Sequence, residues 1–266
     1  MRRHDLGELH EQSWFPTALR DAVTNVLQCL LNVTQYHRAV AALLRPALKK
    51  AGSSQVVDLC SGAGGPWIRL AEQFPEHSFS VSLTDKYPNE QRLSTRKRQS
   101  REISYMGDSL DATDVPTSLS GFQTLFNSAH HFNRSQLKRI LENAVRRREG
   151  IAIFEVPQRN AVTVGMSILM SVGAFFAVPL VEPFGVSLFF WTYVVPLIPL
   201  VMWLDGAASC LRAYTVSEFR ELCTAEMSEQ YRWSAGILKG GSLVPVTYLI
   251  GLPSHEQRPI LDGTIR

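Results

Sequence analysis

Short apolar runs alternate with longer segments of helical periodicity through most of the chain. The segment 134–148 shows the helical pattern, with apolar residues three and four positions apart. The runs that predict strands cover 55–60, 78–85, 103–107, 122–127, 150–156, 231–238 and 244–252. Strands that alternate with helices favour an α/β fold, in which a mostly parallel sheet carries helices on both faces.

Residues 1–52 are predicted to form a helical cap. The apolar residues with helical spacing in its first helix are Leu19, Val23, Val26, Leu27, Leu30 and Leu31. A second helical stretch, "QYHRAVAALLRPALKK", ends at Gly52, and glycine commonly terminates helices. We expect this cap, with "SWFPTALRD" near its start, to help cover a substrate pocket.

Residues 161–204 form an apolar insert. The segments 161–181 and 183–204 contain no charged residue, and "EPFG" between them predicts a turn. About 20 apolar residues suffice to span the hydrocarbon core of a bilayer, so the insert predicts a helical hairpin. The prolines expected to kink it are Pro179, Pro196 and Pro199. Three roles are open for the hairpin: membrane association, a dimer interface, or a lid over an apolar pocket.

Composition and charge narrow the classes of function. Charged residues make up 19% of the chain, against roughly 25% in soluble domains, and the shortage lies in the insert. A net charge of +3 is too small to indicate nucleic acid as a partner. The four cysteines, Cys29, Cys60, Cys210 and Cys223, lack the spacing of a zinc site. The sequence therefore predicts no metal and a reducing, cytoplasmic compartment.

The segment 92–101, "RLSTRKRQSR", carries five basic residues. A solvated helix face is the ordinary explanation of such a run, and contact with anionic lipid headgroups is the alternative. Nucleic acid fits less well because no aromatic residues interleave with the charges.

A glycine-rich turn, "SGAGG", lies between the first predicted strand and a helix. Gly62, Gly64 and Gly65 allow a tight turn in which a ligand can approach the backbone closely. Asp85 ends the second predicted strand, 20 residues after Gly65, a spacing at which an acid accepts hydrogen bonds from ribose hydroxyls. Trp67 occupies the place of the third glycine of the dinucleotide pattern, which argues against a pyrophosphate-binding site.

The motifs "VVDLCSGAGGPW", "LTDKYP", "GDSLDATDVP" and "LFNSAHHF", in this order, resemble those of class I S-adenosylmethionine-dependent methyltransferases. The resemblance covers residues 55–156 and the last two predicted strands. It implies a seven-stranded, mostly parallel Rossmann-like sheet with the last strand antiparallel, built from residues 53–160 and 205–266. It also implies S-adenosylmethionine as the cofactor.

The same resemblance implies which residues bind S-adenosylmethionine. Asp58 would help to fix the amino group, often through water, and Asp85 would bind the ribose. Asp111 would contact the adenine amino group, with Asp108 as the alternative. The full implied set is Asp58, Cys60, Ser61, Gly62, Ala63, Gly64, Asp85, Lys86, Asp108, Asp111, Ala112 and Asn127. Loop capping by the acids after the second and third strands, and simple packing of the cysteine, remain the alternatives.

The motif "NSAHHF" follows the fourth predicted strand, at the edge where open α/β sheets bind ligands. His130 and His131 should therefore lie near the methyl group that is transferred. Imidazole titrates near neutral pH and is the commonest general base, so either histidine could deprotonate a hydroxyl acceptor. A cofactor contact or packing is the alternative for the histidines, and helix capping is the alternative for Asn127.

The apolar insert leaves the predicted sheet after the fifth strand, beside the edge where an acceptor would bind. We therefore expect methyl transfer to a hydrophobic small molecule, which can reside in a membrane. Arg159 and Arg212 flank the insert and favour the cytoplasmic face of that membrane, the inner one in a bacterium; a cytoplasmic protein and a homodimer are the alternatives. Two other functions stay open: another nucleotide-type transferase on this fold, such as an aminopropyl transferase, and a non-catalytic cofactor-binding module anchored to a membrane.

Overall fold

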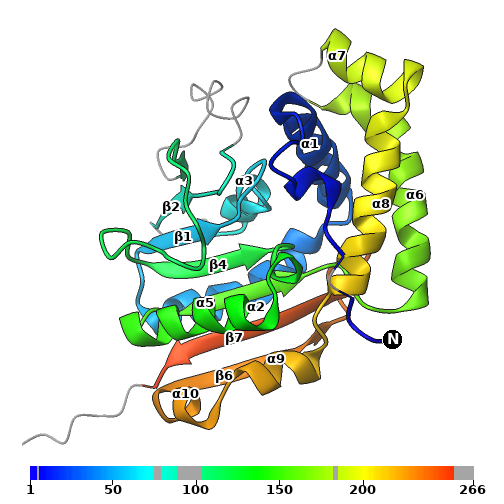
Figure 1. The fold of residues 1–266 in the computed structure, drawn as a ribbon. Coiled ribbons are helices and arrows are strands. Elements are labelled where there is room, and N and C mark those ends of the chain that lie inside the picture. Colours follow the sequence, from blue (N-terminus) through cyan, green and yellow to red (C-terminus); the bar gives the residue numbers. More distant parts are fainter. Residues whose placement is uncertain (5, 75–78, 89–102, 182–184, 255–266) are drawn as a thin grey trace, which may run out of the picture.

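A computed structural model describes residues 1–4, 6–74, 79–88, 103–181 and 185–254. Its centre is one seven-stranded sheet with the strand order β3-β2-β1-β4-β5-β7-β6 (Figure 1). The strands are β1 (Gln55–Leu59), β2 (Ser80–Leu83), β3 (Ile103–Tyr105), β4 (Phe122–Phe126), β5 (Ile151–Glu155), β6 (Tyr231–Leu238) and β7 (Val246–Pro253). Strands β1 to β5 pair in parallel, and β7 is antiparallel to both of its neighbours. The predicted seven-stranded, mostly parallel sheet is confirmed.

The central strands are covered on both faces, so their side chains do not alternate between apolar and polar. Every residue of β4 and β5 is buried. The helices α2 (Tyr36–Ala51) and α3 (Trp67–Leu70) pack on one face, and α5 (Arg134–Arg147) and α9 (Val216–Leu222) pack on the other. Shorter helices are η2 (Ala71–Gln73), η4 (Ala129–His131) and α10 (Ala225–Gln230). Burial on both faces explains why continuous apolar runs marked these strands.

The N-terminal residues are helical, as predicted. They form η1 (Leu9–Glu11), α1 (Thr17–Val33) and α2. Gly52 ends α2 with a left-handed φ of 61°, so the predicted C-cap is confirmed. Helix α1 does not lie on the sheet with α2 but stands beside the helices of the apolar insert (Figure 1).

The apolar insert forms a helical hairpin. Its elements are α6 (Ala161–Ala177), η5 (Val178–Leu180), α7 (Val186–Phe189), the π-helical η6 (Phe190–Val194) and α8 (Leu197–Arg212). Among the described residues, one helix, Ala161–Leu180, is long and apolar enough to cross a membrane. The second arm is bent by 73° between η6 and α8, and α8 continues past residue 204, the predicted end of the insert.

The three prolines of the insert do not all kink or break its helices as predicted. Pro196 precedes α8 at the bend and interrupts the second arm, as predicted. Pro199 lies in the first turn of α8, where a helix does not need its N–H group, so a kink there was a wrong expectation. Pro179 lies within η5. The basic segment 92–101 and the predicted turn 182–185, apart from Gly185, lie outside the described residues.

The hairpin has one buried side and one exposed side. On the buried side, Ala174, Val178 and Val201 pack in one core with Val23 and Val26 of α1. The exposed large apolar side chains, which we call the outer surface, are Val162, Met166, Ile168, Leu169, Val172, Phe176, Leu180, Val186, Phe189, Phe190, Tyr193, Val194, Val195, Leu200, Trp203 and Leu204. Soluble monomers rarely expose so much apolar surface in one segment.

Candidate active site

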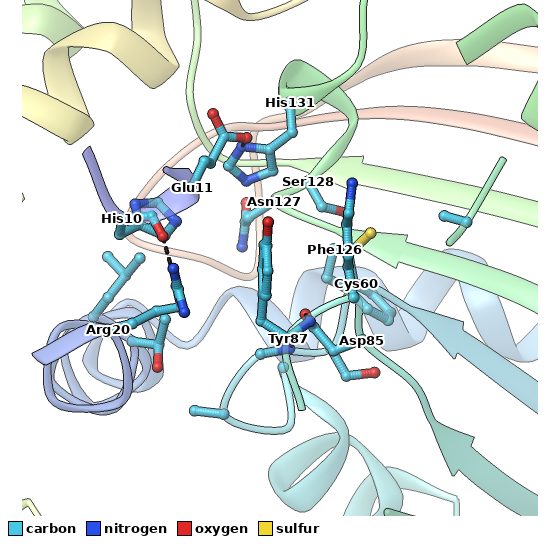
Figure 2. Close-up of a pocket in the computed structure, with 18 of the residues that line it drawn as sticks. His10, Glu11, Arg20, Cys60, Asp85, Tyr87, Phe126, Asn127, Ser128 and His131 are labelled. Carbon is cyan, nitrogen blue, oxygen red and sulfur yellow. Dashed lines mark hydrogen bonds and ion pairs between the residues drawn. The ribbon is translucent and has the colours of Figure 1, made fainter. Parts of the chain in front are cut away.

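A cavity of about 330 Å³ lies at the carboxyl ends of β1, β2 and β4, with α1 on its other side. This volume is at the lower end of the roughly 300–1,000 Å³ typical of small-ligand sites. The implied cofactor residues that line it are Cys60, Ser61, Gly62, Ala63, Asp85, Lys86, Asp111, Ala112 and Asn127. Figure 2 shows Cys60, Asp85 and Asn127 around this cavity, with His10 and Arg20 on its other side. Three of the implied cofactor residues do not line the cavity: Asp58, Gly64 and Asp108.

The turn after β1 depends on left-handed backbone conformations. Gly64 has a φ of 109°, and a Cβ atom there would come within 2.2 Å of the Tyr105 hydroxyl oxygen, so a side chain has no room. Cys60 also adopts a left-handed φ, 59°, which costs a non-glycine residue roughly 1 kcal/mol. Burial, followed by the nearby Asp85 carboxylate, raises the pKa of the Cys60 thiol well above its usual value. The thiol therefore stays protonated, in keeping with the packing alternative.

Asp58 lies behind this turn. Its carboxylate oxygens accept hydrogen bonds from Thr124 Oγ1 at 2.6 Å and from Ser61 Oγ at 2.7 Å. Burial raises the pKa of Asp58 to about 7, although both hydrogen bonds oppose the shift. A Cβ atom on Gly65 would lie 3.5 Å from Asp58 Oδ2, so the turn separates this carboxylate from the cavity. Asp58 can reach a ligand in the cavity only through an intervening group such as water.

Asp58→Asn should stabilise the ligand-free protein increasingly as the pH rises from 5 to 8. The folded-state pKa of Asp58 is raised to about 7, above the value near 3.9 in an unfolded chain. Between these values the folded state binds more protons, so the wild-type protein loses stability as the pH rises. Asparagine does not titrate. Melting temperatures of both proteins across this pH range test the expectation, with exposed Asp108→Asn as the control. A difference that does not change with pH would contradict it.

Asp85, directly after β2, faces the cavity and is held by two backbone groups. The N–H of Gly62 donates to Oδ2 at 2.7 Å, and the N–H of Tyr87 donates to Oδ1 at 2.8 Å. Burial raises the pKa of Asp85, and the two hydrogen bonds work in the opposite direction. Each carboxylate oxygen can accept a second hydrogen bond, so a pair of ribose hydroxyls is a fitting ligand.

The two acids considered for adenine lie in different surroundings. Asp111 lines the cavity, whereas Asp108 is exposed and outside its wall. The backbone N–H and the hydroxyl of Thr113 donate to Asp111 Oδ1 at 2.8 and 2.7 Å. Partial burial opposes ionisation, but these bonds prevail and lower the pKa of Asp111. The structure therefore favours Asp111 over Asp108.

The loop after β4 is fixed by Glu155 at the end of β5. Glu155 Oε1 accepts hydrogen bonds from the backbone N–H groups of Ser128 and Ala129 at 2.8 and 2.7 Å. Asn127 lines the cavity, and its side-chain oxygen accepts an N–H group directly after β5 at 2.8 Å. The N-cap residue of η4 is Ser128 and that of α5 is Asn133, so Asn127 caps neither helix.

The two histidines occupy different positions. His131 lines the cavity, and 21% of its side chain is exposed. His130, with 3% exposed, lies outside the cavity wall, and its Nδ1 is 2.6 Å from Glu155 Oε2. Burial works against a charged His130, but the Glu155 carboxylate outweighs it and raises the pKa of this imidazole. Contact with a substrate is thus possible for His131 and not for His130. His131 Nδ1 lies 2.5 Å from Glu11 Oε1, as an ion pair rather than an aligned hydrogen bond.

The N-terminal segment supplies cavity residues that the sequence analysis missed. His10 and Glu11 line the cavity from η1, and Arg20 lines it from α1. Arg20 donates to the His10 carbonyl oxygen at 2.7 Å and lies 4.4 Å from the centre of the Tyr87 ring. A signal was present in the sequence, because polar residues interrupt the apolar face of α1. Those buried on it are Arg20, Asp21, Asn25 and Gln28.

The polar end of α8 holds η1 against the cavity. Asp205 Oδ2 is 2.8 Å from His10 Nδ1. Arg212 donates to Glu11 Oε2 and to the His131 carbonyl oxygen, both at 2.6 Å. The helix that completes the apolar hairpin therefore also fixes the side chains on the N-terminal wall of the cavity.

No protein-family model matches the sequence, and no curated protein is similar to it. Among solved structures, plantazolicin methyltransferase BpumL in complex with SAH has a TM-score of 0.58 and 12% identity, over 92% of this chain and 95% of that one. Human N-acetylserotonin methyltransferase in complex with SAM has a TM-score of 0.55 and 13% identity, over 93% of this chain and 59% of that one. The chain has the class I methyltransferase fold. In this fold the cavity lies where the strand order reverses, between β1 and β4, which is the usual ligand position in open α/β sheets.

Proposed function

We propose that the protein transfers a methyl group from S-adenosylmethionine to a hydrophobic small molecule that reaches the cavity from a membrane. The observation that carries the proposal is that the glycine turn, Asp85 and Asp111 surround one cavity at the reversal of strand order. BpumL and human N-acetylserotonin methyltransferase, which share the fold, are methyltransferases with SAH or SAM in their structures. Their reaction class supports the proposal.

The cavity wall fits the parts of S-adenosylmethionine. Asp85 would accept hydrogen bonds from the ribose hydroxyls, and Asp111 would accept one from the adenine amino group. The turn 60–65 leaves room for the methionine part because its glycines carry no side chain. The buried charge of Asp58 would attract the amino group through water. The cofactor supplies an activated methyl group on a sulfonium, and the protein must hold it beside an acceptor.

The cavity wall also fits an acceptor that is largely apolar. Leu27, Phe126 and Phe132 provide apolar surface on this wall, and His131 and Glu11 provide a polar pair. Catalysis would consist mostly of aligning the acceptor nucleophile with the methyl carbon. An aminopropyl transferase would need carboxylates free to face a polyamine, but Glu11 is engaged by Arg212 and His131. A module that only binds the cofactor would not need this polar pair beside an apolar wall.

The membrane part of the proposal is supported by the outer surface of the hairpin. Both arms of the hairpin return to the sheet beside the cavity, so immersing the outer surface in lipid would bring the cavity to an acceptor dissolved there. The flanking arginines make ion pairs within the protein: Arg159 Nη2 is 2.6 Å from Glu218 Oε2, and Arg212 Nη1 is 2.6 Å from Glu11 Oε2. Both flanking arginines are thus paired with carboxylates and do not add free positive charge beside the hairpin. The location of the protein at the cytoplasmic face of a membrane therefore stays a prediction.

The double variant Phe176→Glu/Val186→Glu should not sediment with liposomes, whereas the wild-type protein should. Both side chains lie on the outer surface, 76% and 86% exposed, so the change leaves the core intact. A charged residue in the hydrocarbon core costs roughly 2.5–3.5 kcal/mol. With methyl-labelled S-adenosylmethionine and a lipid extract of the source cells, the wild type should label an organic-soluble product and the variant should not.

The matched control is Val33→Glu/Leu243→Glu, because these side chains are also exposed, at 61% and 77%, but lie outside the hairpin. It should sediment like the wild type. If instead the wild type stays in the supernatant as a dimer and Phe176→Glu/Val186→Glu is monomeric, the outer surface is a dimer interface and the membrane proposal is wrong.

A further inference from the structure

Three side chains beside the cavity have the composition of a metal site: Glu8 of the N-terminal segment, and His130 and His131 of η4. One donor atom each of Glu8, His130 and His131 lies within 4.8 Å of the other two. Glu8 Oε1 is 3.5 Å from His130 Nε2 and 3.7 Å from His131 Nδ1. Two ligands of one tetrahedral zinc ion lie about 3.3–3.5 Å apart, given bonds of about 2.0–2.2 Å. These atoms are therefore close to the spacing that one ion requires.

His130 is oriented in the way that metal-binding histidines are. Its Nδ1 lies 2.6 Å from Glu155 Oε2, and the other oxygen of Glu155 is held by the backbone N–H groups of Ser128 and Ala129. A carboxylate accepts hydrogen bonds, so Nδ1 carries the hydrogen, and Nε2 of the neutral ring keeps its lone pair on the side of Glu8. Metal-binding histidines commonly donate their second N–H group to such a carboxylate.

His131 contributes a second nitrogen. Its Nδ1 is buried and has no aligned hydrogen bond, although Glu11 Oε1 lies 2.5 Å away. Arg212 binds the other oxygen of Glu11 at 2.6 Å, which leaves Oε1 directed at the imidazole. The 2.5 Å separation of Nδ1 and Oε1 is shorter than that of two ligands of one ion, so Glu11 would contribute a neighbouring negative charge and not a ligand.

The charge of the cluster also fits a cation. Glu8, Glu11 and Glu155 supply three negative charges, and Arg212 supplies one positive charge. With neutral imidazoles, two negative charges remain among these groups, which a divalent ion would balance. Nearby His10 Nδ1 lies 2.8 Å from Asp205 and 3.6 Å from Glu8 Oε2, so the added carboxylate of Asp205 offsets a positive charge on His10.

We propose that this cluster binds one divalent transition-metal ion, with Zn²⁺ and Mn²⁺ as the fitting ions because imidazole and carboxylate ligands suit both. The ligands would be Glu8, His130 and His131. His131 lines the cavity, so the ion would lie beside it. No zinc spacing was recognised in the sequence because the ligands come from segments more than a hundred residues apart and include no cysteine.

The site also narrows the acceptor class, a step that rests on the proposed function. A metal ion lowers the pKa of a hydroxyl group that it contacts, so the acceptor would present an oxygen there. The hydroxyl proton leaves to solvent, and an oxygen electron pair forms the bond to the methyl carbon. The carbon–sulfur bond breaks, and the sulfur keeps its electron pair, which gives SAH and a methylated oxygen.

The test is calorimetric titration of the full chain, free of any polyhistidine tag and depleted of metal with EDTA, with ZnCl₂ and with MnCl₂. We expect one ion per chain for at least one of the two metals. Glu8→Gln and His131→Ala should each weaken its binding at least tenfold, and Glu155→Gln should weaken it 10- to 100-fold by releasing the His130 ring. Exposed His4→Ala is the control and should bind like the wild type.

Absence of stoichiometric binding of either ion, or equal binding by His131→Ala, would show that the cluster is only a set of ion pairs. Glu8 is buried, so folding of Glu8→Gln is checked by circular dichroism; the partly exposed His131 keeps the test valid if that variant unfolds. Binding of S-adenosylmethionine is titrated on the same metal-free sample. Cofactor binding without metal binding would overturn only the metal site, whereas metal binding without cofactor binding would overturn only the proposed function.

Discussion

His131→Ala should lower the turnover of methyl transfer about 100-fold or more and leave the affinity for S-adenosylmethionine within about twofold of the wild type. His131 is the predicted catalytic histidine that lines the cavity, whereas His130 lies outside its wall. A positioned acid–base group contributes about 10²–10⁴-fold to a rate, and loss of a ligand that activates the acceptor has an effect of similar size. Either role requires the imidazole.

The measurement is the rate of label transfer from methyl-labelled S-adenosylmethionine at saturating cofactor, with binding followed by calorimetry. His4→Ala, at an exposed site, should retain the wild-type rate. Near-normal turnover of His131→Ala would mean that this side chain neither aligns nor activates the acceptor, and that the N-terminal end of the cavity has another purpose.

Asp85→Ala should weaken binding of S-adenosylmethionine by about 1.5–3 kcal/mol, since it removes hydrogen bonds to a charged acceptor. This corresponds to roughly 10- to 150-fold in the dissociation constant. The turn would also lose the hydrogen bond from the Gly62 N–H group to Oδ2, at 2.7 Å. Unchanged affinity in calorimetry would refute the assignment of the ribose site.

The matched control for Asp85→Ala is Asp108→Ala, which removes an acid of the same edge that does not line the cavity. It should leave the affinity unchanged. The loss of affinity in Asp111→Ala should lie between those in Asp85→Ala and Asp108→Ala, because Asp111 lines the cavity but is more exposed than Asp85. This order of effects would show which of the two acids after β3, Asp108 or Asp111, binds the cofactor, a choice that the sequence alone left open.

The sheet could be predicted because its strands are short apolar runs bounded by glycine, aspartate and asparagine, and because the order of the motifs matches that of a known fold. The position of Asp85 followed from the same order. Asp58 was harder to place, because its type and spacing say nothing about the turn that separates it from the cavity. The choice between Asp108 and Asp111 needed the structure, since both acids stand in one loop and only packing decides which faces inward.

The N-terminal wall could not be predicted from local patterns. Glu8, His10 and Glu11 look like a solvated stretch, but Asp205 and Arg212, some 200 positions away, bury and pair them. Ion pairs over such separations leave no periodicity that a reader of the sequence can detect. The hairpin itself was recognisable from its length and lack of charge. Its packing against α1 could not be predicted, because the apolar pattern of a helix does not show which other helix it contacts.

The contact between the hairpin, α1 and η1 has a consequence for anyone who exchanges parts between methyltransferases. The hairpin cannot be transferred to another protein by itself. Removing 161–212 would expose the buried side chains of Val23 and Val26 and would break the ion pair between Glu11 and Arg212. A chimera that carries the hairpin to another sheet would have to include residues 1–33 as well.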